Sequence, residues 1–154
     1  MPDLGRVAAL ATLALLTGCS VVEPEPWDDR QIDLERARAR WAEADPGSYR
    51  YDFFQGCFCA APVGHFVVTV TDGVVTAAVT EHDGEPVSDA TLDGLPTVEG
   101  LFDVVDGAIR AEVDGYRVGY HPDHGFPTVI DLDRDERAID DELRIEAGGL
   151  VPLP

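Results

Sequence analysis

The chain has 154 residues, and its 30 acidic and 11 basic residues give it a formal net charge of −19. A surface with this charge repels phosphate groups, which excludes nucleic acid and anionic lipid headgroups as binding partners. The hydrophobic fraction of 45% is ordinary for a globular protein. The length suffices for one domain with a core of its own.

The chain begins with the pattern of an export signal. Arg6 precedes an apolar run over residues 7–16, and two small residues then precede Cys19. The run is shorter than the roughly 20 residues that cross a bilayer, and the small residues before a cysteine resemble the lipobox of bacterial lipoproteins. We therefore expect a signal peptide at residues 1–18 and a lipid anchor on Cys19. Residues 19–27, which contain two prolines, predict an extended tether.

A helix is predicted over residues 28–44. Leu34, Ala37 and Trp41 recur on one face of it. Acidic residues stand early in the segment and arginines late, as the helix dipole favours. The residues Asp45-Pro46-Gly47 end the helix.

Three strands are predicted next, over residues 48–55, 65–71 and 74–80, because apolar side chains alternate along them. Asp72-Gly73 separates the last two. This pair accepts the positive φ angles of a type I′ turn, so it predicts a β-hairpin. Residues 81–96 predict a polar loop.

A second helix is predicted from Val98 to Val113, with Thr97 as its N-cap. Its apolar residues, at spacings of three and four, form a stripe made of Val98, Leu101, Phe102, Val105 and Ile109. Strands are predicted over residues 116–120, 128–132 and 143–147. The order α-β-β-β-α-β-β-β indicates a single α+β domain over residues 28–154. We expect an antiparallel sheet of about six strands with two helices packed on one face.

Several short motifs follow one another along the chain in a recognisable order. They are Trp41, Tyr49-Arg50-Tyr51, Cys57-Phe58-Cys59, Asp72-Gly73, Thr97-Val98-Glu99 with Leu101-Phe102, Gly125-Phe126-Pro127 and Ile139-Asp140-Asp141-Glu142. Together they resemble the bacterial secreted proteins and lipoproteins of domain of unknown function family 6174, over roughly residues 34–147. The usual Gly-Tyr-Pro of that family reads Gly-Phe-Pro here, so no role is expected for a phenol hydroxyl at Phe126. The family has no established activity, and the resemblance implies fold and location alone.

Cys57 and Cys59 are the sharpest candidate site. Paired thiols tend to oxidise outside the cytoplasm. In a flat strand, Cα atoms two positions apart are about 6.5–7 Å apart, at the limit for a disulfide. Gly56 and the Ala-Ala-Pro that follows favour a bulge or turn that lets the bond close. We expect a structural disulfide of modest stabilising effect. A reactive redox pair and a thiolate site for Cu(I) or Zn stay open as alternatives.

The acidic segment Asp131–Glu142 is a second candidate site. Acidic residues at its positions 1, 3, 5 and 12 fit the ligand spacing of an EF-hand loop. Position 6, which needs glycine, is Glu136, and the flanking residues predict strands rather than helices. We expect a solvated connector, with calcium binding as the alternative.

His121-Pro122-Asp123-His124 offers two imidazoles and a carboxylate to a transition metal, but an exposed polar turn is the expected structure. His65 and His82 stand alone in the sequence. None of the three serines, Ser20, Ser48 and Ser88, lies in a nucleophile motif. No catalytic residue, metal or cofactor is therefore predicted.

These patterns predict a non-catalytic binding or interaction module rather than an enzyme. We expect a monomer, held by its lipid anchor on the extracytoplasmic face of the bacterial cell membrane, with an unknown protein or small molecule as its partner. The alternative is a protein that binds calcium through residues 131–142, or a thiol-redox protein that uses Cys57 and Cys59.

Overall fold

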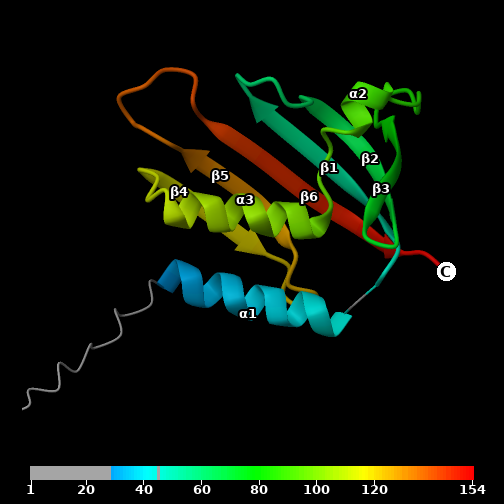
Figure 1. Cartoon of the computed structure of the whole chain (residues 1–154), viewed down its shortest axis with the longest axis horizontal. Coiled ribbons are helices and arrows are strands. Elements are labelled where there is room, and N and C mark those ends of the chain that lie inside the picture. Colours follow the sequence, from blue (N-terminus) through cyan, green and yellow to red (C-terminus); the bar gives the residue numbers. More distant parts are fainter. Residues whose placement is uncertain (1–28, 45) are drawn as a thin grey trace, which may run out of the picture.

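A computed structural model describes residues 29–44 and 46–154, so the predicted signal peptide, Cys19 and the tether lie outside the described residues. Six strands form one antiparallel sheet in the order β3-β2-β1-β6-β5-β4. The helices α1 and α3 lie side by side on one face of this sheet (Figure 1). The predicted α+β fold is confirmed. The elements are α1 (Asp29–Ala44), β1 (Tyr49–Cys57), β2 (Gly64–Thr71), β3 (Val74–Thr80), α2 (Asp89–Leu92), α3 (Val98–Arg110), β4 (Gly115–Tyr120), β5 (Pro127–Asp133) and β6 (Leu143–Pro152).

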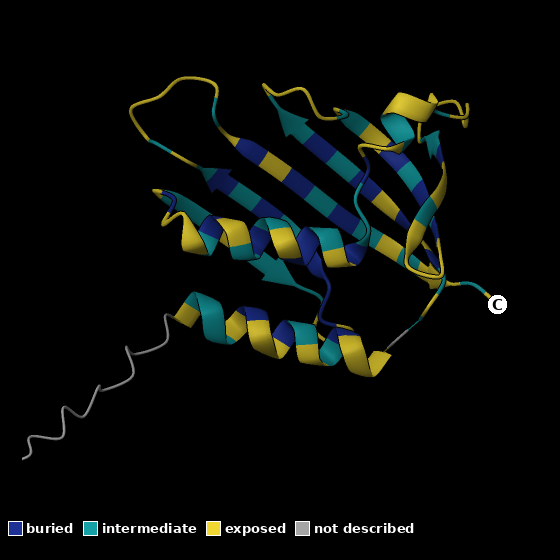
Figure 2. Cartoon of the chain, viewed as in Figure 1, coloured by how far each residue is buried: buried dark blue, intermediate teal, exposed yellow. Residues whose placement is uncertain are grey.

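The core lies between the helices and the sheet, as the stripes of buried residues in Figure 2 show. On β1 the side chains of Tyr49, Tyr51 and Phe53 point into it, and their neighbours in sequence point to the opposite face. On α1 the buried residues are those that the helical spacing predicts, Leu34, Ala37 and Trp41. Burial of apolar surface at these periodic positions is what holds each helix on the sheet.

Two local predictions are confirmed by backbone geometry. Asp72 and Gly73 both have positive φ, +49° and +75°, as a type I′ turn requires. Thr97 caps α3, because its hydroxyl accepts a hydrogen bond from the backbone N–H of Gly100 at 3.2 Å.

Three differences from the predicted elements involve more than two residues. The segment predicted as a polar loop contains the short helix α2, whose first turn is capped by Ser88. The helix α3 ends three residues early, at Arg110, because Glu112 takes a positive φ of +50°. The strand β6 runs five residues further than predicted, to Pro152, because an irregularity in its pairing with β1 lets hydrogen bonding resume at Arg50 and Val151.

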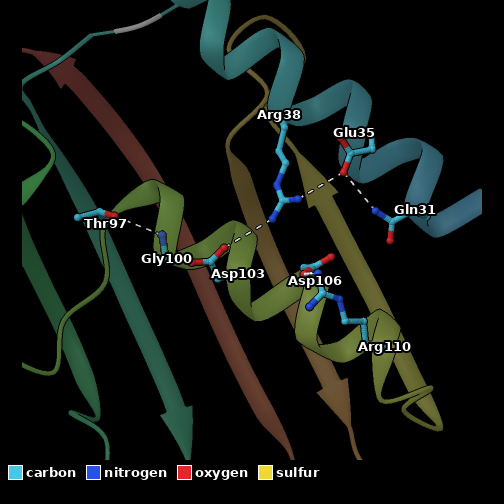
Figure 3. A network of polar contacts seen from close by, with 8 residues as sticks. All are labelled: Gln31, Glu35, Arg38, Thr97, Gly100, Asp103, Asp106 and Arg110. Carbon is cyan, nitrogen blue, oxygen red and sulfur yellow. Dashed lines mark hydrogen bonds and ion pairs between the residues drawn. The ribbon is translucent and has the colours of Figure 1, made fainter.

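Arg38 joins the two large helices on their solvent side, as Figure 3 shows. Its guanidinium lies 3.3 Å from Glu35 on α1 and 3.6 Å from Asp103 on α3. Gln31 adds a hydrogen bond to Glu35 at 3.2 Å. Exposed contacts of this kind contribute at most about 1 kcal/mol each, so they orient the helices more than they stabilise them. None of the described helices is both long enough and apolar enough to cross a membrane.

Candidate functional site

Trp41, Tyr49 and Glu99 meet where α1, β1 and the start of α3 come together. The Trp41 indole N–H donates to Glu99 Oε1 at 2.7 Å, and the Tyr49 hydroxyl donates to Glu99 Oε2 at 3.4 Å. The Tyr49 hydroxyl also accepts from the backbone N–H of Val98 at 2.9 Å. Burial, assisted by the Glu99 carboxylate, raises the pKa of Tyr49 well above its usual range, so the hydroxyl stays a donor. We call these three side chains the Glu99 cluster.

Two more motif residues complete the surroundings of this cluster. The Tyr51 hydroxyl donates to the carbonyl oxygen of Pro96, just before α3. The Phe126 ring packs edge-on against Trp41, with ring centroids 6.2 Å apart. Gly125 has a φ of +78°, and a Cβ there would collide with the carbonyl oxygen of Ala37. These parts of the family pattern therefore hold the helices on the sheet.

Cys57 and Cys59 lie at the end of β1, where the chain turns away from the sheet. Their Cα atoms are 5.3 Å apart, closer than in a flat strand, and the structure joins the two residues in a disulfide. This geometry fits the turn that Gly56 and the Ala-Ala-Pro segment favour. Cys57 is half-buried and Cys59 is exposed, and Phe58 between them is 83% exposed. A surface recess is lined by these three residues and Ala60.

Gln55 is the residue at this site that the sequence analysis missed. It is only 8% exposed, and its Nε2 lies 3.6 Å from the sulfur of Cys57 and 3.9 Å from that of Cys59. The amide thus offers a hydrogen-bond donor to either sulfur. The one signal for it was the alternation along β1, which places position 55 on the core-facing side, where a polar residue needs a partner.

The segment between β5 and β6 leaves the sheet beside the disulfide, because Cys57 pairs with Leu143 across the β1–β6 ladder. Within it, Arg137 contacts Asp135 at 3.0 Å, and the Asp141 carboxylate accepts from the backbone N–H of Asp135 at 2.9 Å. Ile139, at the tip, is 87% exposed.

Calcium binding was the alternative for the segment Asp131–Glu142, and several of its acidic residues are held by arginines. Asp131 lies on β5 and pairs with Arg117 and Arg144, while Asp135 is held by Arg137. No group of three or more His, Cys, Asp or Glu side chains in the described residues is placed to hold a metal ion. The geometry therefore does not favour the calcium alternative or the thiolate metal site.

The histidines and serines of the sequence analysis have local contacts in the fold. In the turn after β4, His121 Nδ1 accepts from the backbone N–H groups of Asp123 and His124, at 3.3 and 3.2 Å. Ser48 accepts from the backbone N–H of Asp72 at 3.1 Å, and Ser88 caps α2. Ser20 lies outside the described residues.

His65 lies on the sheet face that the helices do not cover. Its ring packs against Phe54 on the neighbouring strand, with centroids 4.4 Å apart, and its Nδ1 lies 3.3 Å from Glu81. His65, Glu81 and His82 border one surface recess. Phe54, His65 and Glu81 border a second one. The pairing of Phe54 with His65 across two strands has no signature in the sequence.

The structure is that of an α+β protein. The motif residues described in the sequence analysis build the Glu99 cluster and two adjacent loops at one end of the sheet. Comparison with protein families finds a match to a family of unknown function, DUF6174, over residues 33–152. The chain belongs to this family. Comparison of the chain with curated proteins and with solved structures finds no match.

Proposed function

We propose that the protein is an exported, lipid-anchored and non-catalytic interaction module that binds a protein partner through the loop end of its sheet. The loop end comprises residues 58–63, between β1 and β2, and residues 134–142, between β5 and β6. The observation that carries this proposal is the exposure of Phe58 and Ile139 on adjacent loops, in two motifs that serve neither the core nor the Glu99 cluster.

The chemistry of the loop end indicates the kind of partner. Phe58, Val63 and Ile139 are exposed on these two loops, and exposed apolar side chains on neighbouring loops are typical of protein contacts. Acidic residues on the second loop surround Ile139 in sequence. An apolar protein segment flanked by basic residues would complement this surface.

The position of α1 supports a membrane-proximal partner. The helix begins near the loop end, because the Arg30 guanidinium lies 4.9 Å above the ring of Tyr116, at the start of β4. The predicted tether at residues 19–27 spans at most about 30 Å when extended. A lipid on Cys19 would thus keep the loop end close to the bilayer.

A photo-crosslinking residue placed at position 58 or 139 of the full chain, in the cells that produce it, tests the partner site. We expect a discrete crosslinked protein adduct from both positions. Val74 is the matched control, because it is 62% exposed at the opposite end of the sheet, and it should give no such adduct. Equal adducts from all three positions, or none from 58 and 139, would contradict the proposal.

The anchor is tested separately by Cys19→Ala. Without a thiol to carry a lipid, the protein should move from the membrane fraction to the soluble fraction. The measurement is the distribution of the chain after cell fractionation. A variant that stays wholly with the membrane would show that Cys19 is not the anchor.

A further inference from the structure

We infer that Cys57–Cys59 is a thiol–disulfide exchange site, which takes a low-molecular-weight or protein thiol as its reductant. This activity goes beyond partner binding and does not depend on it. The inference rests on the exposure of Cys59, the Gln55 amide beside both sulfurs, and the position of the bond at the edge of the core.

The two cysteines differ in access. Both border the surface recess, but Cys59 is exposed, whereas Cys57 is half-buried at the end of β1. Exchange rates depend on which sulfur a thiolate can reach and on how well the other sulfur leaves. The geometry therefore selects Cys59 as the attacked sulfur and Cys57 as the leaving one.

Gln55 favours this direction of cleavage. Its buried Nε2 is closer to Cys57 Sγ than to Cys59 Sγ, at 3.6 against 3.9 Å. A hydrogen bond to a charged sulfur is stronger than one to a neutral sulfur. Gln55 is thus a positioning residue that stabilises the thiolate left on Cys57.

Reduction leaves the rest of the fold intact. The bond closes a loop with one residue between the cysteines, and so small a loop constrains the unfolded chain little. Cys57 is only partly buried where it packs against the core, and Cys59 is not part of the core. The protein can therefore exist in both redox states as a folded molecule.

The exchange proceeds in two balanced steps. A thiolate RS⁻ attacks Cys59 Sγ, an S–S bond forms between them, and the Cys57–Cys59 bond breaks with its electron pair on Cys57, which takes a proton. A second RS⁻ then attacks the sulfur of the first R group, releasing RSSR and the Cys59 thiolate, which is protonated in turn. Overall, two thiols are oxidised to one disulfide, and the protein disulfide is reduced to two thiols.

Equilibration with glutathione buffers tests the activity, in the full chain with Cys19→Ala so that Cys57 and Cys59 are its only cysteines. The reduced fraction is read by acid quench, alkylation and intact mass. We expect half-reduction within the range of glutathione ratios found between oxidising and reducing cell compartments. A disulfide that stays closed at every ratio, and opens only with dithiothreitol, would overturn the inference.

Two further measurements test the roles of the residues. Gln55→Leu should shift the half-reduction point by about threefold to tenfold toward more reducing buffer, whereas Gln31→Leu, on the surface of α1, should leave it unchanged. If Gln55→Leu still melts cooperatively and its half-reduction point is unshifted, Gln55 does not stabilise the Cys57 thiolate. Independently of that variant, Cys57→Ser should form a mixed disulfide with oxidised glutathione several-fold faster than Cys59→Ser does. Equal rates would overturn the choice of Cys59 as the attacked sulfur.

Discussion

Asp131 and Asp133 lie two positions apart on β5 and meet opposite electrostatic surroundings. Asp131 is flanked by the guanidinium groups of Arg117 and Arg144. Asp133 has a buried carboxylate oxygen that finds no hydrogen-bond partner in the described part of the chain. Partial burial, and after it nearby carboxylates led by that of Asp141, raises the pKa of Asp133. The folded state therefore holds this proton more tightly than the unfolded state does, and the ionised form opposes folding.

We expect Asp133→Asn to raise the melting temperature at pH 7, and Asp131→Asn to lower the free energy of unfolding by a few tenths to about 1 kcal/mol. Asp133 does not destabilise the fold below its ordinary pKa of about 3.9, where both states hold the proton. Its destabilising effect develops as the pH rises through the raised pKa of the folded state. Thermal melts between about pH 3 and pH 8 should thus show the Asp133→Asn gain disappear at the acidic end. If Asp133→Asn instead lowered the melting temperature at pH 7, the ionised Asp133 carboxylate would be stabilised by its surroundings in the folded state.

The Glu99 cluster connects three elements, α1, β1 and α3. A helix, a strand and a second helix meet at one carboxylate, which accepts from Trp41 and Tyr49 while Tyr49 accepts from the backbone of α3. A buried donor left without its partner costs more than the bond itself contributes. The cluster therefore couples the packing of α1 on the sheet to the packing of α3.

A double-mutant cycle measures that coupling. Glu99→Ala and Trp41→Phe should each lower the free energy of unfolding by about 1–2 kcal/mol, and the double variant should cost about 1 kcal/mol less than their sum. Glu43→Ala, at an exposed position of α1, should change it by less than about 0.5 kcal/mol. The measurement is denaturant unfolding, and additive losses would show that the Trp41–Glu99 bond adds nothing.

At the scale of the whole molecule, the net charge of −19 dominates the electrostatics. Like charges repel across the surface, and this repulsion destabilises the compact state. Arg38, Arg117 and Arg144 relieve it only locally, each beside acidic residues. The charge of the molecule therefore favours solubility at some expense of stability.

Added salt should stabilise the protein for this reason. Raising NaCl from about 10 mM to about 150 mM shortens the screening length from roughly 30 to 8 Å, so we expect the melting temperature at pH 7 to rise. A sucrose series serves as the control, because sucrose acts by exclusion from the surface and not by screening. A melting temperature that falls with NaCl would indicate that attractive ion pairs outweigh the repulsion.

The candidate site was partly predictable. Cys57 and Cys59 are conspicuous in the sequence, and a turn that brings them together is suggested by Gly56 and the residues that follow. Glu136, in the place of glycine, already spoke against the EF-hand-like spacing after Asp131. What the sequence did not show is that Arg117, Arg137 and Arg144 contact acids of this segment from both neighbouring strands and from within it. Gln55 was missed, because its importance depends on which side of β1 faces the core.

Local patterns in the sequence determined the elements of this protein: the helical face of Leu34, Ala37 and Trp41, the Thr97 cap and the Asp72-Gly73 turn. These depend on interactions among residues a few positions apart, which composition and spacing express directly. The tertiary structure alone decided that β1 pairs with β6, which places the Cys57–Cys59 turn beside residues 134–142. It also decided that α1 packs against α3, which brings Glu99 to Trp41. Trp41 and Glu99 are 58 positions apart, and Tyr49 and Pro152 are 103 apart. Such contacts arise from the packing of complete elements around a shared core, which no local pattern encodes.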